Sequence, residues 1–248
     1  VRLFGDSVYL VGGPVRDLLR AADRRAALDI DLLVTGLSYE EIATRLAAFG
    51  KTNTVGRSFA VIKFSAGGQT YDIAIPRRDR KRTAEAHDHR NFEIETGPQV
   101  TLEEDLSRRD FTCNSIALRL ADGQLFDPFD GAGAIRRRVL AMTSPDSFRD
   151  DPLRVLRAAR FAARFEFSIE RAIFDTAQGV VLDELSAERV AEELCRLLLE
   201  AERPGTGLDA YWQLSALDKL YPELARLALT IQDAQFHPET DAQGHHTV

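Results

Sequence analysis

Residues 8–20 read VYLVGGPVRDLLR, a short apolar run that meets two glycines and a proline. The apolar run Val8–Val11 predicts a buried strand, and Gly12 and Gly13 predict a tight turn after it. A helix is expected from Pro14, because its ring fixes φ near the helical value and its missing N–H needs no partner there. Backbone N–H groups at such a turn and at the helix N-terminus can hold phosphate oxygens.

A second strand is predicted over residues 28–34 and carries two aspartates, Asp29 and Asp31. Side chains two positions apart in a strand point to the same face, so the two carboxylates emerge side by side. They repel each other unless a cation lies between them, and oxygen ligands of this kind suit Mg²⁺. On its own, the Asp-x-Asp pattern is also consistent with a solvated strand edge.

Two more strands are predicted over 60–64 and 69–75, joined by a hairpin turn. Apolar residues take one face of the second strand, which leaves the carboxylate of Asp72 on the other face. The order of glycine turn, Asp-x-Asp strand and later strand carboxylate resembles the polymerase-beta-like nucleotidyltransferase core. Three carboxylates can hold two metal ions, which activate an attacking hydroxyl and stabilise the leaving pyrophosphate.

The rest of the chain divides into a charged segment and a helical part. Residues 76–104 are charged and irregular, which predicts a mobile loop near the working surface. The pattern becomes helical after about residue 137, so the fold class is α+β, a small mixed sheet with helices followed by an all-helical part. The expected domains are a catalytic head over 1–137, a helical neck over 138–203 and the start of a helical body over 204–248.

The composition indicates a globular chain that can bury a sizeable core. The 248 residues are 44% hydrophobic and 29% charged. No apolar run approaches the roughly 18 to 20 residues needed to span a bilayer, so no membrane association is expected. Cys113 and Cys195 have neither disulfide-framework nor zinc spacing, which favours a cytoplasmic, reducing compartment.

The net charge of −7 is distributed unevenly. Residues 1–164 hold 26 basic and 23 acidic residues, whereas residues 165–248 hold 6 and 16. Of the 32 basic residues 28 are arginines, whose guanidinium groups suit bidentate contacts with phosphates and base edges. A high-GC coding sequence would also produce many arginines, so their positions are more informative than their number.

The opening motif, in which Arg16 and Asp17 follow the glycines and Asp29 and Asp31 come later, resembles that of the class II tRNA nucleotidyltransferases (CCA-adding enzymes) and bacterial poly(A) polymerases. The resemblance implies transfer of nucleotides to RNA with two Mg²⁺ ions. Asp29 and Asp31 would bind both ions, and Asp72 would assist in activating the 3′-hydroxyl. By the same resemblance, the triphosphate would be held by Gly12, Gly13 and Arg16.

A second motif, RRDFTCN at residues 108–114, is similar to the family's R-R-D-F-T-x-N. In the family, the arginine and aspartate of this motif are associated with selecting a ribonucleotide through its sugar hydroxyls. The resemblance therefore implies that Arg109 and Asp110 bind the ribose.

A third motif, DDPLR at residues 150–154, resembles the family's E-D-x-x-R, although position 150 departs from the usual Glu. In the family, the second acidic residue and the arginine of this motif hydrogen-bond the edge of incoming C or A, so the resemblance implies base selection by Asp151 and Arg154. On the same predicted helix, Arg157 and Arg160 are expected either to contact the nucleotide or RNA phosphates, or to form the solvated face of an amphipathic helix.

These motifs together predict template-independent addition of C, C and A to the 3′ end of tRNA from CTP and ATP, with the acceptor stem as partner. Within the same class, the alternatives are a bacterial poly(A) polymerase and enzymes restricted to CC or to A. From other classes, the alternatives are an RNA-binding module without catalysis and a nucleotidyltransferase of the aminoglycoside-modifying type.

The end of the chain, from about residue 236, resembles the entry to an HD phosphohydrolase domain. His246 would be the first metal ligand of that domain, but the other ligands are absent from this sequence. Because a single histidine cannot make such a site, no HD activity is expected of these 248 residues.

Overall fold

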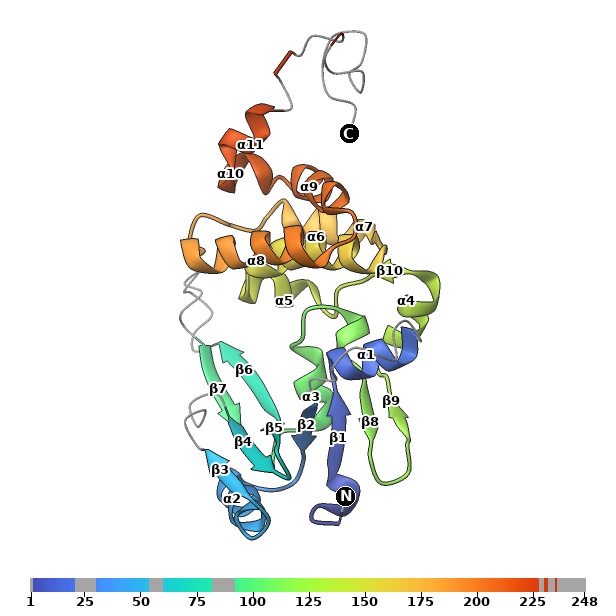
Figure 1. Cartoon of the computed structure of the whole chain (residues 1–248), viewed down its shortest axis with the longest axis vertical. Helices are drawn as coiled ribbons and strands as arrows, with labels where there is room; N and C mark the ends of the chain where they lie inside the picture. Colours follow the sequence, from blue (N-terminus) through green and yellow to red (C-terminus); the bar gives the residue numbers. More distant parts are fainter. Residues whose placement is uncertain are drawn as a thin grey trace. The chain divides into compact units, whose positions relative to one another are not determined.

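The computed structural model describes residues 2–20, 30–53, 60–81, 92–227, 230–231 and 235. Asp29 and the segment with His246 lie outside the described residues. The chain forms two compact units, one of Val1–Arg137 with Ala141–Ser147 and one of Arg138–Leu140 with Phe148–Val248. A sheet with helices in the first unit and a largely helical second unit confirm the predicted α+β class (Figure 1).

The first unit is built on a seven-stranded mixed sheet with the order β3-β4-β5-β2-β1-β8-β9. The parallel pair is β2 with β5, and β1 runs antiparallel to both β2 and β8. The apolar run and the aspartate strand predicted from the sequence are therefore neighbours. The strands are β1 Val8–Val11, β2 Asp31–Val34, β3 Lys51–Asn53, β4 Val61–Ala66, β5 Gln69–Ala74, β8 Ala117–Arg119 and β9 Leu125–Phe126.

Apolar residues cover both faces of the sheet at β2. Leu33 and Val34 are fully buried and belong to two different core clusters, because adjacent strand residues point to opposite faces. Val34 packs in a cluster with Ile42 of helix α2 (Tyr39–Ala47). A Ser38–Glu41 capping box begins that helix and satisfies backbone donors at its first turn. Because β2 is buried on both faces, its only exposed residue is Asp31, at the start of the strand.

The turn after β1 leads directly into α1 (Gly13–Arg20), as predicted. The described part of the first unit also contains the helices α3 (Leu102–Ser107) and α4 (Gly131–Arg137). The N-terminus of α3 carries a capping box formed by Thr101 and Glu104.

The prediction of a loop over 76–104 is wrong for the described part of that segment. Strands β6 (Arg77–Lys81) and β7 (Phe92–Thr96) form an antiparallel pair, and α3 begins within the segment. The charged residues that suggested a loop form ion pairs with one another. Arg78 lies 2.8 Å from Glu95 across the strand pair and 2.7 Å from Glu104 of α3. Alternating charges thus stabilise a ribbon whose charged composition resembles that of a solvated loop.

The second unit contains mainly helices, with α6 packed against α8 and α9. The buried face of α6 is formed by small and apolar side chains, including Val155, Ala158 and Ala159. None of the helices in the described ranges is long and apolar enough to cross a membrane. The elements are β10 Val139–Leu140, α6 Leu153–Phe165, β11 Ser168–Ile169, α7 Arg171–Ala177, α8 Ala187–Glu200, α9 Pro204–Gln213, α10 Leu217–Leu220 and α11 Pro222–Leu227. The residues of α5 (Pro145–Asp150) are divided between the two units, after Ser147.

Candidate active site

Two of the three predicted catalytic carboxylates lie on neighbouring strands. Asp31 begins β2, and it is the register partner of Asp72 in the parallel strand β5. Asp31 is exposed, and the side chain of Asp72 is 43% exposed. On the far side of β5, Lys63 of β4 donates from Nζ to both carboxylate oxygens of Asp72, at 3.1 and 3.3 Å. The sheet therefore places Asp31 and Asp72 side by side on two neighbouring central strands, whereas Asp29 lies outside the described residues.

The chemistry of this pair suits a divalent cation. Carboxylate oxygens on adjacent strands are the hard ligands that Mg²⁺ prefers. Within the part of the chain that the structure describes, no group of three or more acidic, histidine or cysteine side chains could hold a metal ion, and Asp29 is not in that part. Asp31 and Asp72 thus fit a Mg²⁺ site to which a further carboxylate would be added.

The glycine turn lies beside Asp31, where the end of β1 meets the start of β2. The antiparallel register pairs Leu10 with Leu32, so the end of β1 that leads into Gly12 meets the end of β2 that carries Asp31. Gly12 adopts φ +72°, which L side chains rarely adopt. Its N–H donates to the carbonyl of Ile116 at 3.3 Å. Gly12 therefore contributes the shape of the turn, while its own N–H is engaged within the protein.

Arg16, on the first turns of α1, is held in place from two sides. It is 6% exposed, and its Nη1 donates to Oδ1 of Asn114 at 2.7 Å. Its Nε and Nη2 donate to the two carboxylate oxygens of Asp17, each at 2.9 Å. Such a fork fixes the guanidinium plane, so a cationic group stands beside the glycine turn with little freedom to lose.

The RRDFTCN motif joins this network through Asp110 and Asn114. Asp110 is buried, and its Oδ1 accepts from Nδ2 of Asn114 at 2.9 Å and from the N–H of Phe111 at 2.8 Å. The same Asn114 contacts Arg16. The predicted triphosphate-binding and ribose-binding residues are thereby connected by hydrogen bonds through a residue to which the sequence analysis assigned no role.

A second residue missed by the sequence analysis is Asp105 of α3, which is fully buried. It lies 2.6 Å from Nη2 of Arg108 and 2.9 Å from Nη2 of Arg109. Burial raises the pKa of Asp105, but the charges of Arg109 and Arg108 outweigh it and hold the pKa below its ordinary value. The available signal was the spacing of a helical acid three and four residues before two arginines that follow the end of the helix.

In the second unit, the two predicted base-selecting residues flank the start of α6. Asp151 accepts from the N–H of Leu153 at 3.3 Å, which places its carboxylate at the helix N-terminus. Nη2 of Arg189, on α8, donates to both oxygens of Asp151 at 2.9 and 3.1 Å. Arg154 is half-buried one turn further on.

The expectation of a solvated arginine face on α6 is wrong for Arg160. This residue is 2% exposed, and its Nε donates to Oε2 of Glu193 on α8 at 2.6 Å. Nη1 of Arg157 lies 3.6 Å from the other oxygen of Glu193, and the Arg157 side chain remains 28% exposed. Because it pairs with the buried carboxylate of Glu193 on α8, Arg160 lies in the interior. The periodicity of α6 alone cannot indicate this.

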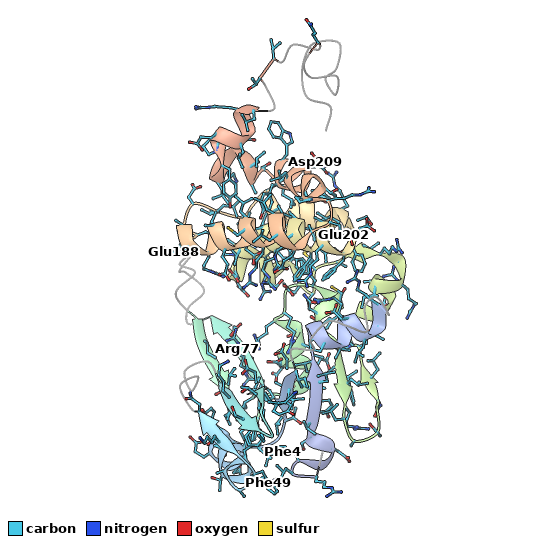
Figure 2. All side chains as sticks on the ribbon, viewed as in Figure 1. Phe4, Phe49, Arg77, Glu188, Glu202 and Asp209 are labelled. Carbon is cyan, nitrogen blue, oxygen red and sulfur yellow. The ribbon has the colours of Figure 1, made fainter. Side chains whose placement is uncertain are left out.

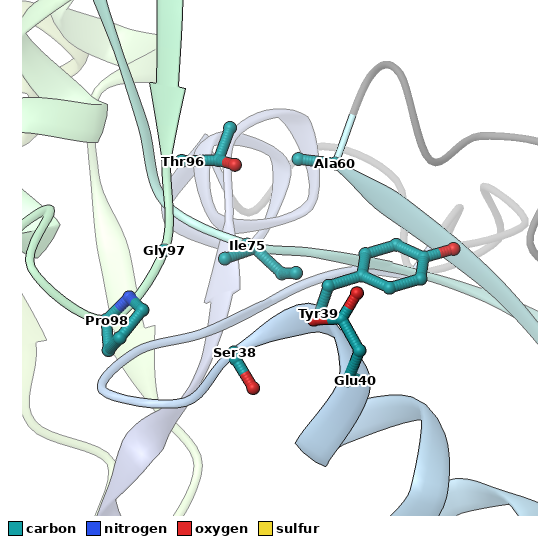
Figure 3. Close-up of a pocket in the computed structure, with 8 residues that line it drawn as sticks. All are labelled: Ser38, Tyr39, Glu40, Ala60, Ile75, Thr96, Gly97 and Pro98. Carbon is teal, nitrogen blue, oxygen red and sulfur yellow. The ribbon is translucent and has the colours of Figure 1, made fainter.

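A cavity of about 290 Å³ lies elsewhere in the first unit, lined by Ser38, Tyr39 and Glu40 of the α2 start, Ala60, Ile75 and the segment 96–98 (Figure 3). Ile75 follows the carboxyl end of β5, whereas Asp72 lies nearer its middle. The cavity contains none of the residues that the motifs single out, so we assign it no part in the site.

Comparison with known protein families places the chain. Residues 8–141 match the Poly A polymerase head domain, and residues 164–227 match the domain described as "Probable RNA and SrmB- binding site of polymerase A". The chain therefore belongs to the family defined by the Poly A polymerase head domain. This confirms the resemblance found in the sequence.

Individual relatives agree with this assignment. The Multifunctional CCA protein of Stenotrophomonas maltophilia (strain K279a) is 42% identical over 245 residues, which cover 96% of this chain and 57% of that protein. The CCA-adding enzyme of Bacillus stearothermophilus in complex with CTP is 31% identical, with a TM-score of 0.67 and coverage of 82% and 47%. The Thermotoga maritima CCA-adding enzyme complexed with tRNA is 30% identical, with a TM-score of 0.69 and coverage of 90% and 52%. The chain thus spans little more than half of the curated relative it matches.

Proposed function

We propose that this chain carries out template-independent addition of C, C and A, or part of that sequence, to the 3′ end of tRNA from CTP and ATP. The observation that carries the proposal is the pairing of Asp31 with Asp72 on neighbouring strands, next to the turn at Gly12 that leads to Arg16. The CTP and tRNA complexes of the structural relatives support the choice of substrates.

In this proposal, the carboxylates of the first unit hold Mg²⁺, which when bound would polarise the phosphate and favour ionisation of the attacking hydroxyl. Asp29 and Asp31 are the proposed ligands, and Asp72 assists in activating the RNA 3′-hydroxyl. Lys63 balances the charge of Asp72 before substrate binds. The carboxylates thereby stay close together without a net repulsion that would splay β2 and β5.

The other roles follow the hydrogen-bonded network. Arg16, fixed by Asn114 and Asp17, stabilises negative charge on the triphosphate at little reorganisation cost. Arg109 and Asp110 contact the ribose. Gly12 and Gly13 allow close approach of the phosphates to the turn.

In the second unit, Asp151 and Arg154 read the base edge, since a carboxylate accepts from an exocyclic amine and a guanidinium donates to ring acceptors. Arg157 contacts nucleotide or RNA. Arg160, which was expected to make the same contact, is buried and shares the carboxylate of Glu193 with Arg157. We further propose the head, neck and body regions 1–137, 138–203 and 204–248, with the tRNA acceptor stem as partner and the cytoplasm as compartment.

The deciding experiment is extension of three tRNA transcripts that end before the first C, after C and after CC, with each nucleotide separately and together under Mg²⁺. Completion of CCA followed by arrest is the expected result. Addition of CC alone or A alone would identify a restricted enzyme, and long A tails would identify a poly(A) polymerase.

A matched pair of variants tests the site itself. Asp31→Asn should abolish extension and spare tRNA binding, whereas Asp122→Asn, in the exposed turn between β8 and β9, should leave extension unchanged. Extension by the Asp31 variant at the unmodified rate would show that the carboxylate assignment is wrong. Binding of tRNA without extension by the unmodified chain would favour a catalytically silent RNA-binding module.

A further inference from the structure

We propose that Asp105 is a positioning residue for ribose selection, because it holds Arg109 against the Gly12 turn. The inference rests on the proposed function, in which Arg109 contacts the ribose. Asp105 itself is fully buried and acts only through the arginines that it binds.

Both carboxylate oxygens of Asp105 are occupied, each by a different arginine. Oδ2 accepts from Nη2 of Arg109 at 2.9 Å. Oδ1 accepts from Nε and Nη2 of Arg108 at 3.1 and 2.6 Å. A buried carboxylate is costly unless it is paired and fully hydrogen-bonded, and this arrangement meets both conditions. The geometry of Arg109 is therefore determined by a rigid, water-excluded partner.

The second amino group of Arg109 is directed at the candidate site. Its Nη1 lies 2.9 Å from the position of a Cβ atom on Gly12, and 3.4 Å from the carbonyl oxygen of Asn114. The Arg109 side chain is 19% exposed, against 1% for Asp105. One end of the guanidinium is thus anchored in the interior, and the other faces the turn that precedes α1.

Asp105 also fixes the start of the β6–β7 ribbon. The N–H of Arg77, the first residue of β6 and labelled in Figure 2, donates to Oδ1 of Asp105 at 3.2 Å, and the carbonyl of Arg77 accepts from Nε of Arg108 at 3.0 Å. A shift of this ribbon would therefore act on the same carboxylate that holds Arg109. This connection makes Asp105 the junction of the ribbon, α3 and the ribose-facing arginine.

The test is the isosteric variant Asp105→Asn, which keeps the volume and removes the charge. With one charge-assisted hydrogen bond to Arg109 weakened, the preference for CTP over dCTP should fall about tenfold. The readouts are the KM and kcat of extension and, independently of extension, the Kd values of CTP and dCTP by calorimetry. A purely structural defect would weaken both nucleotides equally and leave their ratio unchanged.

Two further variants complete the experiment. Glu104→Gln, at the neighbouring position on α3, removes the ion pair with Arg78, keeps an amide oxygen that can accept from the Thr101 N–H, and should leave the CTP/dCTP ratio unchanged. Arg109→Gln leaves the Asp105–Arg108 pair in place and should reduce the ratio as Asp105→Asn does, which keeps the proposal testable if the Asp105 variant does not fold.

The outcomes separate the inference from the function. A lower preference for CTP over dCTP in the Asp105 and Arg109 variants, but not in the Glu104 variant, supports the inference. A lower CTP/dCTP ratio in the Arg109 variant alone overturns the inference about Asp105, while the assignment of Arg109 to the ribose stands. An unchanged CTP/dCTP ratio in both the Asp105 and the Arg109 variants also overturns the inference, and CCA addition is then judged separately by tRNA extension. If the unmodified chain extends no tRNA, the function fails, and the calorimetric ratio still decides the role of Asp105.

Discussion

Nη1 of Arg109 lies 2.9 Å from the position that a Cβ atom on Gly12 would occupy. Gly12 therefore meets two requirements at once, a backbone φ of +72° and room for the guanidinium of a residue almost one hundred positions later in the chain. Only glycine satisfies both without strain.

The first prediction concerns Gly12→Ala, with Gly123→Ala as its matched control. Gly123 has φ +75° and no atom within 4 Å of the position of a Cβ, so both variants carry the same backbone strain, about 1–2 kcal/mol. Only Gly12→Ala must also displace Arg109. We expect similar losses of stability in urea denaturation, and a fall in CTP affinity, measured by calorimetry, for Gly12→Ala alone.

A double variant isolates the contact. In a background of Arg109→Ala, where the guanidinium is gone, Gly12→Ala should cost no more CTP affinity than the Arg109 change by itself. An additive effect of the two changes would show that the alanine acts on the turn and not through Arg109.

How much of this arrangement is visible in the sequence depends on the range of each interaction. The strand, turn and helix around Gly12 follow from local periodicity and turn chemistry, and the alternation of Asp72 with apolar residues predicts the face on which its carboxylate lies. The position of Asp72 beside the aspartate strand is a matter of sheet topology, which alternation does not indicate. Asp105 and Glu193 were missed because an acidic residue on a helix reads as solvated until its partners are known. The pairing of β6 with β7 was missed because the opposite charges on the two strands, such as Arg78 and Glu95, are far apart in the sequence and become partners only when the strands pair.

The second prediction concerns the buried pair of Arg160 and Glu193. Glu193→Gln removes the carboxylate 2.6 Å from the buried Arg160 guanidinium and leaves only the more distant Glu200 at 3.7 Å, so the variant should lose about 3 kcal/mol of unfolding free energy. The neighbouring Glu192 pairs with Arg196 on the exposed face of α8, and Glu192→Gln should cost less than about 0.5 kcal/mol. Urea denaturation of the two variants measures the contrast, and equal losses would mean that the Arg160 pair is solvated in solution.

The third prediction concerns Arg189, which holds the carboxylate of Asp151 from α8. The pair is partly exposed, so Arg189→Met should change stability by less than about 1 kcal/mol. Because Asp151 is the proposed reader of the base edge, its release should lower the preference for C over A at tRNA ends that accept C. The ratio of kcat/KM for CTP and ATP measures this. Arg196→Met, on the same helix, is the control and should leave the ratio unaltered; a change in both variants would point to a general effect on α8.

The fourth prediction is the acid sensitivity conferred by Asp105. Its pKa in the folded protein lies below the ordinary value of 3.8, because the charges of Arg109 and Arg108 outweigh the effect of burial. The unfolded chain therefore binds the proton first as the pH falls, so the stabilisation is complete above about pH 5 and is lost as the pH falls through the folded pKa. The difference in unfolding free energy between the unmodified chain and Asp105→Asn, followed by urea denaturation from pH 7 to pH 3, should shrink below about pH 4. A difference that stays constant over this range would exclude Asp105 as the titrating group.

The last prediction uses the two cysteines as reporters of the two units. Cys113, within RRDFTCN, is 1% exposed, and burial with the nearby charge of Asp110 raises the pKa of its thiol to about 12, whereas Cys195 on α8 is exposed. Since the thiolate is the reactive form, about one Cys113 thiol in 10⁴ is ionised at pH 8 even before access is considered. A thiol reagent should therefore label Cys195 rapidly in the folded protein. In a Cys195→Ser variant, labelling should occur only as fast as the first unit opens and should accelerate in urea, while Cys113→Ser should keep the rapid reaction. Rapid native labelling of the Cys195→Ser variant would show that the RRDFTCN segment is open to solvent, and that the packing which fixes Asp110 and Asn114 does not persist in solution.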